Sequence, residues 1–177
     1  MIVTLIGYRG SGKSTVAEPL AKRLGFDWID ADAEIEQRAC RSIRAIFADE
    51  GEAGFRRRER DLLAELLVRD HLVLAAGGGA VLDADTRREM RAAGPVVWLE
   101  APADVLAQRI AADFTTAERR PDLTATGGRS EIDTLLAARE PLYRSVATMI
   151  VAVGESGVEE IVEQIVTSIG PNAGGKG

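Results

Sequence analysis

The segment from Gly7 to Ser14 reads GYRGSGKS and fits the pattern G-x-x-x-x-G-K-[ST]. Its glycines let the backbone wrap around an anion with the N–H groups turned inward, and the N-terminus of the helix that follows adds positive potential. Lys13 is placed to reach the outer phosphates of a nucleotide, and Ser14 supplies a hydroxyl for Mg²⁺. The residues expected to bind the nucleotide are Gly10, Ser11, Gly12, Lys13, Ser14 and Thr15.

Two aspartates, Asp30 and Asp32, lie two residues apart in the sequence DWIDADAEIE. They come at the carboxyl end of an expected strand, where ligands bind in open α/β sheets. One interpretation divides the work between them, with Asp30 near the metal ion and Asp32 facing a substrate hydroxyl. The alternative is that Asp32 caps the helix that begins here, because aspartate is a favoured N-cap residue.

Four arginines lie close together in the segment GEAGFRRRERDLL of this acidic chain, namely Arg56, Arg57, Arg58 and Arg60. Arginines on a helix usually form a solvated face with ion pairs to nearby carboxylates, here Glu52 and Glu59, and we expect this of the last three. Arg56 differs because it follows Phe55 and stands three residues before Glu59, which could hold its guanidinium steady. A carboxylate ligand needs such an oriented, planar fork.

The elements that would position these residues alternate along the chain. Short apolar runs rich in β-branched residues predict strands at 1–6, 26–30, 71–76, 94–100 and 147–153. Helical periodicity is found at about 13–24, 32–39, 42–69, 84–93, 102–111, 131–145 and 157–169. Because parallel neighbours need crossover connections, this alternation predicts an α/β fold with a parallel sheet covered by helices on both faces.

Composition limits the class of protein. With 177 residues, 46% of them hydrophobic and 28% charged, the chain has the size and balance of one soluble globular unit. Its formal net charge of -6 argues against general nucleic-acid binding, which rests on a positive field. The single cysteine, Cys40, excludes an intrachain disulfide and a cysteine-rich metal cluster. Without a cationic leader or an apolar run long enough to span a membrane, a cytoplasmic location is expected.

Seven segments of the chain occur together in a known order and approximate spacing: GYRGSGKST, IDADAEIE, SIRAIFADEGEAGFRRRE, AAGGGAVL, GPVVWLEAP, RRP and REPLYR. In this the chain resembles the shikimate kinases, over about residues 1–165. The resemblance implies a three-layer α/β/α fold of the P-loop NTPase type, with a five-stranded parallel sheet and a mobile lid. It also implies that ATP, with Mg²⁺ as cofactor, phosphorylates the 3-hydroxyl of shikimate, giving shikimate 3-phosphate and ADP in aromatic amino-acid biosynthesis.

The resemblance also implies roles for single residues. Asp32 matches the aspartate that holds the substrate's hydroxyls, while Arg56 and Arg139 match the arginines around its carboxylate. Ser14 and Asp30 remain the expected metal ligands. Phosphoryl transfer needs alignment and charge neutralisation more than covalent chemistry. Lys13 is therefore expected to act on the phosphates, and Asp32 to orient the attacking hydroxyl and accept its proton.

The glycine run within LAAGGGAV matches the family's run beside the substrate ring and consists of Gly77, Gly78 and Gly79. Glycines permit a ligand to approach the backbone closely and offer N–H donors. The alternative is a simple glycine turn between a strand and a helix, which would need only one or two glycines.

The lid is expected at about residues 112–129, where it would close over the nucleotide and exclude water. Arg120 matches the lid arginine that touches the ATP phosphates and is expected to be catalytic. The sequence here reads ERRPDLT, and Asp122 departs from the leucine that is common in the family. That departure leaves the choice between Arg119 and Arg120 open.

We therefore expect one kinase domain over residues 1–170, a helical substrate-binding region at about 32–62, and a flexible tail at 171–177. The expected partners are ATP and shikimate, with no nucleic acid and no membrane, and the chain is expected to be a monomer. Two alternatives stay open, because P-loops serve many reactions. The first is a related kinase for another small hydroxy acid such as gluconate, and the second is a nucleotide-dependent binding module without catalysis.

Overall fold

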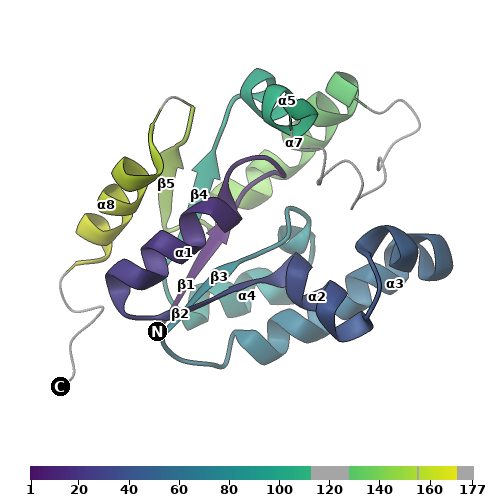
Figure 1. The fold of residues 1–177 in the computed structure, drawn as a ribbon, viewed down its shortest axis with the longest axis horizontal. Coiled ribbons are helices and arrows are strands. Elements are labelled where there is room, and N and C mark those ends of the chain that lie inside the picture. Colours follow the sequence, from purple (N-terminus) through teal and green to yellow (C-terminus); the bar gives the residue numbers. More distant parts are fainter. Residues whose placement is uncertain (113–127, 155, 171–177) are drawn as a thin grey trace.

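The computed structural model describes residues 1–112, 128–154 and 156–170, which form a parallel sheet with helices on both faces (Figure 1). The strands are β1 (Ile2–Ile6), β2 (Asp27–Asp30), β3 (Leu72–Ala75), β4 (Val96–Glu100) and β5 (Met149–Ala152). They lie in the order β2-β3-β1-β4-β5, and neighbouring strands are parallel throughout. The predicted strands, the five-stranded parallel sheet and the three-layer α/β/α class are confirmed.

Each predicted helix is present with small shifts of its ends. The helices are α1 (Lys13–Leu24), α2 (Ala31–Ala39), α3 (Ile43–Leu66), α4 (Ala84–Ala93), α5 (Ala103–Ala112), α7 (Gly128–Val146) and α8 (Val158–Ile169), with a short 3-10 helix, η1 (Ala80–Leu82), after β3. The largest differences are three residues, at the end of α3, which was expected to reach residue 69 and ends at Leu66, and at the start of α7, which was expected at residue 131 and begins at Gly128.

The central strands β1, β3 and β4 are buried on both faces, and this explains their unbroken apolar runs. On β1, Ile2 and Ile6 belong to the core formed with α2, α3, α4 and α7. Val3 and Leu5, which point the other way, belong to the core formed with α1, α5 and α8. Helices α1 and α8 pack side by side on that second face (Figure 1).

The strand order decides where the predicted site lies. β1 is central, β3 and β2 follow on one side of it, and β4 and β5 follow on the other. Ligands of open parallel sheets bind beyond the carboxyl ends of the strands where the order reverses in this way. The segments that follow β1, β2 and β3 therefore emerge next to one another, and they carry the lysine loop, the two aspartates and the glycine run.

Helix α3 is broken at Gly51, whose φ of 67° and ψ of -179° are not helical. Glu50, just before the break, accepts hydrogen bonds of 2.9 Å from Arg58 beyond it and one of 2.6 Å from Arg41. Periodicity alone predicted an unbroken helix here. The glycine allows the turn, and the carboxylate ties together the segments on either side of it.

Some predictions fall outside the described residues. The expected lid, about 112–129, lies almost wholly between the end of α5 and the start of α7, in the part of the chain that the structure does not describe. Arg119, Arg120 and the tail at 171–177 lie outside it as well. Among the helices of the described residues, none combines the length and apolar content needed to cross a membrane.

The packing of β3 against the α3 side of the sheet gives a stability prediction. Leu74 is fully buried, so Leu74→Ala should lower the free energy of unfolding by about 2–5 kcal/mol through the cavity it leaves. The same truncation at Leu82, which is 45% exposed, should cost less than about 1 kcal/mol. Urea unfolding followed by circular dichroism measures both, and similar losses in the two variants would contradict this packing.

Candidate active site

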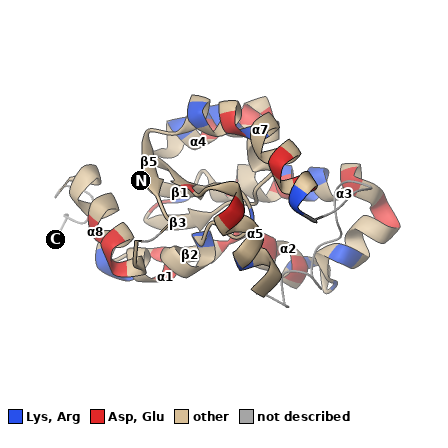
Figure 2. Ribbon diagram, turned by 90° about the horizontal axis from the view of Figure 1, so that it is seen from above, with Lys and Arg blue, Asp and Glu red and all other residues tan. Residues whose placement is uncertain are grey.

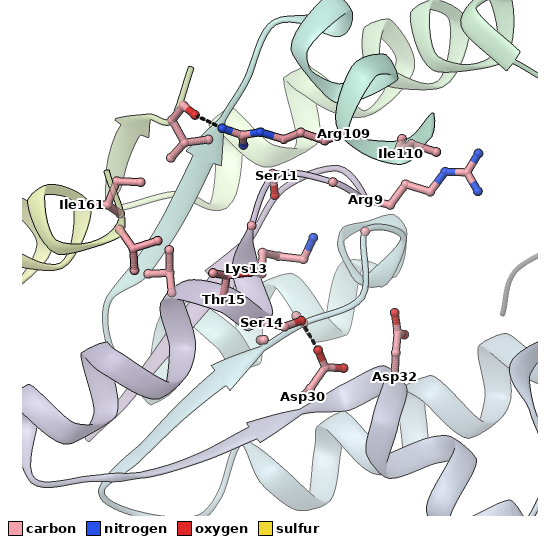
Figure 3. A pocket seen from close by; sticks show the side chains of 18 of the residues that line it. Arg9, Ser11, Lys13, Ser14, Thr15, Asp30, Asp32, Arg109, Ile110 and Ile161 are labelled. Carbon is pink, nitrogen blue, oxygen red and sulfur yellow. Dashed lines mark hydrogen bonds between the residues drawn. The ribbon is translucent and has the colours of Figure 1, made fainter. Parts of the chain in front are cut away.

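A cavity of about 500 Å³ lies beside the loop that follows β1 (Figure 3). Several elements line it, and the predicted residues among its walls are Gly10, Ser11, Gly12, Lys13, Ser14, Thr15, Asp30, Asp32 and Gly78. The structure thus brings the lysine loop, the two aspartates and part of the glycine run together in one cavity.

The lysine loop has the conformation that its glycines predict. Gly10 and Gly12 have φ values of 81° and 90°, which only glycine adopts at little cost. The Nζ atom of Lys13 donates hydrogen bonds to the carbonyl oxygens of Gly7, at 2.9 Å, and Tyr8, at 3.0 Å. The ammonium group is therefore held across the loop, and its charge lies at the cavity where an anion would bind.

Ser14 and Asp30 are in direct contact, because the Ser14 hydroxyl donates to Oδ2 of Asp30 (Figure 3). The other oxygen, Oδ1, accepts from the backbone N–H of Ala33 at 3.1 Å and makes Asp30 the N-cap of α2. The alternative in which Asp32 caps this helix is therefore wrong. The helix begins one residue earlier than expected, and Asp32 lies in its first turn at the cavity wall.

This pair of oxygen donors fits a magnesium ion. Mg²⁺ prefers oxygen ligands and is commonly held by one or two protein side chains, with waters and the phosphates of the substrate completing its shell. A serine hydroxyl and a carboxylate that already touch each other at the end of the lysine loop match that description. Within the described residues, no group of three or more acidic, histidine or cysteine side chains could hold a metal by itself.

Arg56 is fixed by two carboxylates of its own helix. Its Nη1 donates to Oε2 of Glu59 at 2.6 Å, and its Nε and Nη2 lie 3.3 and 3.2 Å from Oε1 of Glu52. Burial works to lower the pKa of Arg56, but the two carboxylates outweigh it and raise the pKa above its ordinary value. Glu59 is only 3% exposed, so the guanidinium is held by a buried anion, as the spacing predicted.

The other arginines of α3 behave differently from one another. Arg57 and Arg58 are exposed as expected, and α3 carries charged residues of both signs (Figure 2). Arg60, however, is less exposed and forms a two-pronged ion pair with Glu89 of α4. The expectation that Glu52 and Glu59 serve these three arginines is wrong, because Arg56 engages both carboxylates.

The glycine run is packed more tightly than a simple turn requires. A Cβ atom on Gly79 would lie 2.3 Å from Nη1 of Arg56, and one on Gly78 would lie 3.3 Å from the carbonyl oxygen of Gly7. Neither glycine has a positive φ, so close packing is the reason for glycine here. The turn interpretation therefore accounts for only part of this segment.

Arg139 and Tyr143 of α7 reach the same glycines. The Tyr143 hydroxyl donates to the carbonyl oxygen of Gly78 at 2.6 Å, and Nη1 of Arg139 lies 3.4 Å from the same oxygen. Burial raises the pKa of Tyr143, and the charges of Arg139 and Arg56 oppose that rise. Two arginines from different helices thus converge on the glycine run, where they can bind a carboxylate.

Sequence reasoning missed several residues of the site. Tyr143 lies within REPLYR but carried no separate signal, and only the fold brings it to Gly78. Arg109 of α5 lines the cavity and donates to the carbonyl oxygen of Val153 at 2.8 Å, beside the loop before α8. Arg9 was passed over because its position in the loop pattern accepts any residue.

The comparisons with known proteins agree with one another. A family model described as shikimate kinase matches residues 9–170. The curated shikimate kinase of Francisella philomiragia is 44% identical over 93% of this chain and 92% of its own length. That of Rhodopirellula baltica is 43% identical over 91% of this chain and 86% of its own length.

Solved structures show the same likeness. The shikimate kinase from Acinetobacter baumannii in complex with shikimate has a TM-score of 0.88 and 37% identity, over 95% of this chain and 92% of that one. A gluconokinase from Sinorhizobium meliloti, with a TM-score of 0.59 and 21% identity over 94% of this chain and 90% of that one, shares the fold. With the family model covering almost the whole chain, and curated relatives more than 40% identical over most of it, this protein belongs to the shikimate kinase family.

Proposed function

We propose that this chain transfers the γ-phosphoryl group of ATP to the 3-hydroxyl of shikimate, giving shikimate 3-phosphate and ADP. The observation that carries the proposal is the convergence of Arg56 and Arg139 on the glycine run, next to the loop that carries Lys13. A carboxylate of the acceptor bound there keeps its hydroxyls within the same cavity as the nucleotide site. A small hydroxy acid suits this arrangement, because its carboxylate can anchor it at the arginines while one of its hydroxyls reacts at the nucleotide.

The nucleotide is assigned to the loop from Gly10 to Thr15. Its backbone N–H groups and the N-terminus of α1 bind the phosphates, and Lys13 exchanges its bonds to the loop carbonyls for the outer phosphates. Ser14 and Asp30 would hold Mg²⁺, which neutralises phosphate charge when bound. Arg120, outside the described residues, is proposed to add a further positive charge at the phosphates.

The acceptor is assigned to Asp32, Arg56, Arg139 and the glycine run. The arginines fix the carboxylate of shikimate, and the glycine backbone lies against its ring. Asp32 orients the attacking hydroxyl towards the nucleotide and accepts its proton as the new bond forms. Holding the two substrates in line supplies most of the catalysis, because phosphoryl transfer asks little covalent work of the protein.

The remaining features of the proposal concern the protein as a whole. Residues 1–170 act as one kinase domain, with α2 and α3 as the substrate-binding region at about 32–62 and a lid at about 112–129. The chain works as a cytoplasmic monomer with ATP and shikimate, without nucleic acid or membrane. Its net charge of -6 supports the absence of a general nucleic-acid role.

The proposed reaction is tested by ADP release in a coupled assay with Mg²⁺ and ATP. We compare shikimate, gluconate and no acceptor at matched concentrations. Release that depends on shikimate supports the proposal. Release with gluconate alone would identify another hydroxy-acid kinase, and nucleotide binding without any acceptor-dependent release would indicate a binding module.

The division of work between the aspartates predicts the effect of Asp32→Asn. The amide keeps the shape but cannot accept the proton, so kcat with shikimate should fall by at least about a hundredfold while the affinity for Mg²⁺-ADP changes little. Calorimetric titration of the nucleotide and steady-state kinetics measure the two quantities. Glu34→Gln, two residues along the same helix and paired with Arg38, is the matched control. Loss of nucleotide affinity in the Asp32 variant would place this residue with the metal ligands instead.

The carboxylate clamp predicts that geometry matters more than charge. Arg56→Lys and Arg139→Lys keep the charge but lose the planar guanidinium fork. Each substitution should raise KM for shikimate about tenfold to a hundredfold. This range corresponds to the loss of one charge-assisted hydrogen bond, worth about 1.5–3 kcal/mol. KM for ATP should change little. Arg57→Lys, at an exposed neighbouring position, should leave both values unchanged. If Arg56→Lys has no more effect than Arg57→Lys, the clamp assignment fails.

A further inference from the structure

The carbonyl oxygen of Gly78 meets two side chains of α7. The Tyr143 hydroxyl donates to it at 2.6 Å, and Nη1 of Arg139 lies 3.4 Å from it. The backbone closes the turn through a different oxygen, because the N–H of Ala80 donates to the carbonyl of Gly77 at 3.0 Å. The middle of the glycine run is therefore held by side chains, and the shorter of the two contacts comes from the tyrosine.

Tyr143 is itself fixed in place by the sheet. Its side chain is fully buried, and its ring stacks on that of Trp98, with 5.7 Å between the ring centres and 28° between the ring planes. Trp98 of β4 is paired with Ile6, the last residue of β1 before the lysine loop. A buried hydroxyl is costly without a partner, and the Gly78 carbonyl is that partner. Burial also raises the pKa of Tyr143, so the hydroxyl keeps its proton and remains a donor.

Arg139 is held more loosely than Arg56. It is 5% exposed, yet among the residues that the structure describes no carboxylate forms an ion pair with it, whereas Arg56 has two. Arg139 contacts neutral groups instead, namely the Gly78 carbonyl, the Tyr143 hydroxyl and the Tyr8 ring, whose centre is 5.7 Å from the guanidinium carbon. To bind a carboxylate with both arms of its fork, this guanidinium has to leave the carbonyl.

We propose that Tyr143 is a positioning residue of the acceptor site, whose hydroxyl keeps the Gly78 carbonyl hydrogen-bonded so that Arg139 can leave this oxygen for the substrate's carboxylate. This inference rests on the proposed function. A buried carbonyl left without a donor costs free energy, and the Tyr143 hydroxyl removes that cost from the binding of the acceptor. In Tyr143→Phe only Arg139 remains of the two donors, so the carbonyl would hold the guanidinium back from the substrate.

Steady-state kinetics in both substrates test the inference. Tyr143→Phe should raise KM for shikimate about tenfold, the loss expected when binding leaves one buried polar group without a partner, with KM for ATP and kcat within about threefold of the wild type. Ser145→Ala, which removes a hydroxyl-to-carbonyl bond of 2.8 Å on the same helix, is the matched control and should leave both KM values unchanged. An unchanged KM for shikimate in Tyr143→Phe, or an equal rise in KM for ATP, would overturn the inference.

The route through Arg139 gives a readout that a loss of packing would not. In the Arg139→Gln background, Tyr143→Phe should change KM for shikimate by less than about twofold, because no guanidinium is left to be held back. The methyl ester of shikimate lacks the carboxylate charge, so the wild type and Tyr143→Phe should use it with the same KM. A full penalty in that background, or on the ester, would overturn the inference, since Tyr143 would then act through the packing of the glycine run alone.

If Tyr143→Phe does not fold, NMR of the wild type decides the question. Glycine labelled in its carbonyl carbon and its nitrogen reports the Gly78 carbonyl through the N–H of Gly79. When shikimate is added, this carbonyl should keep the chemical shift of a hydrogen-bonded group while the Nε signal of Arg139 moves. A carbonyl that loses this shift, or an Arg139 signal that does not respond to shikimate, would refute the role of Tyr143.

These outcomes separate the inference from the function on which it rests. If the wild type does not phosphorylate shikimate, the proposed function fails and the inference falls with it. If the wild type does so and Tyr143→Phe has an unchanged KM for shikimate, only the role of Tyr143 is refuted.

Discussion

The backbone of Gly78 and Gly79 packs closely against its neighbours, and the arrangement of the active site depends on this packing. On one side it touches the lysine loop that binds the nucleotide, and on the other it touches the guanidinium of Arg56. The Tyr143 hydroxyl also holds this backbone, through the hydrogen bond that it donates to the carbonyl oxygen of Gly78. Under the proposed function, this segment lies between the phosphates and the substrate's carboxylate and would set the distance between the two substrates, which phosphoryl transfer requires.

Two arginines beside this segment, Arg56 and Arg9, are each paired with a buried carboxylate, and this has an energetic consequence. A guanidinium that is already oriented loses little conformational freedom when a carboxylate binds, so more of the interaction appears as affinity. The cost is that Glu59 and Glu131 must be desolvated, and each would be strongly destabilising if its arginine were removed.

Much of this could be predicted from the sequence, because the strongest signals are local. The central strands β1, β3 and β4 are apolar on both faces, the lysine loop and the glycine run come just after strands, and Asp30 is the last residue of β2. What could not be predicted depends on distant pairs. Tyr143 meets Gly78 and Arg9 meets Glu131 across 65 and 122 positions of the chain, and no local pattern encodes such contacts. The break of α3 was not foreseen and the cap of α2 was left open for a related reason, since periodicity does not show which of several polar residues the backbone will use.

The most direct test of the account is the position of the phosphate in the product. In the proposed complex, the arginines bind the carboxylate and the glycine run lies along the ring, so that one hydroxyl faces Asp32 and the nucleotide. Proton and phosphorus NMR of the reaction with shikimate should then show a single phosphomonoester coupled to the proton of the 3-hydroxyl carbon. A mixture of monoesters, or a phosphate on another ring hydroxyl, would contradict the proposed alignment of the two substrates.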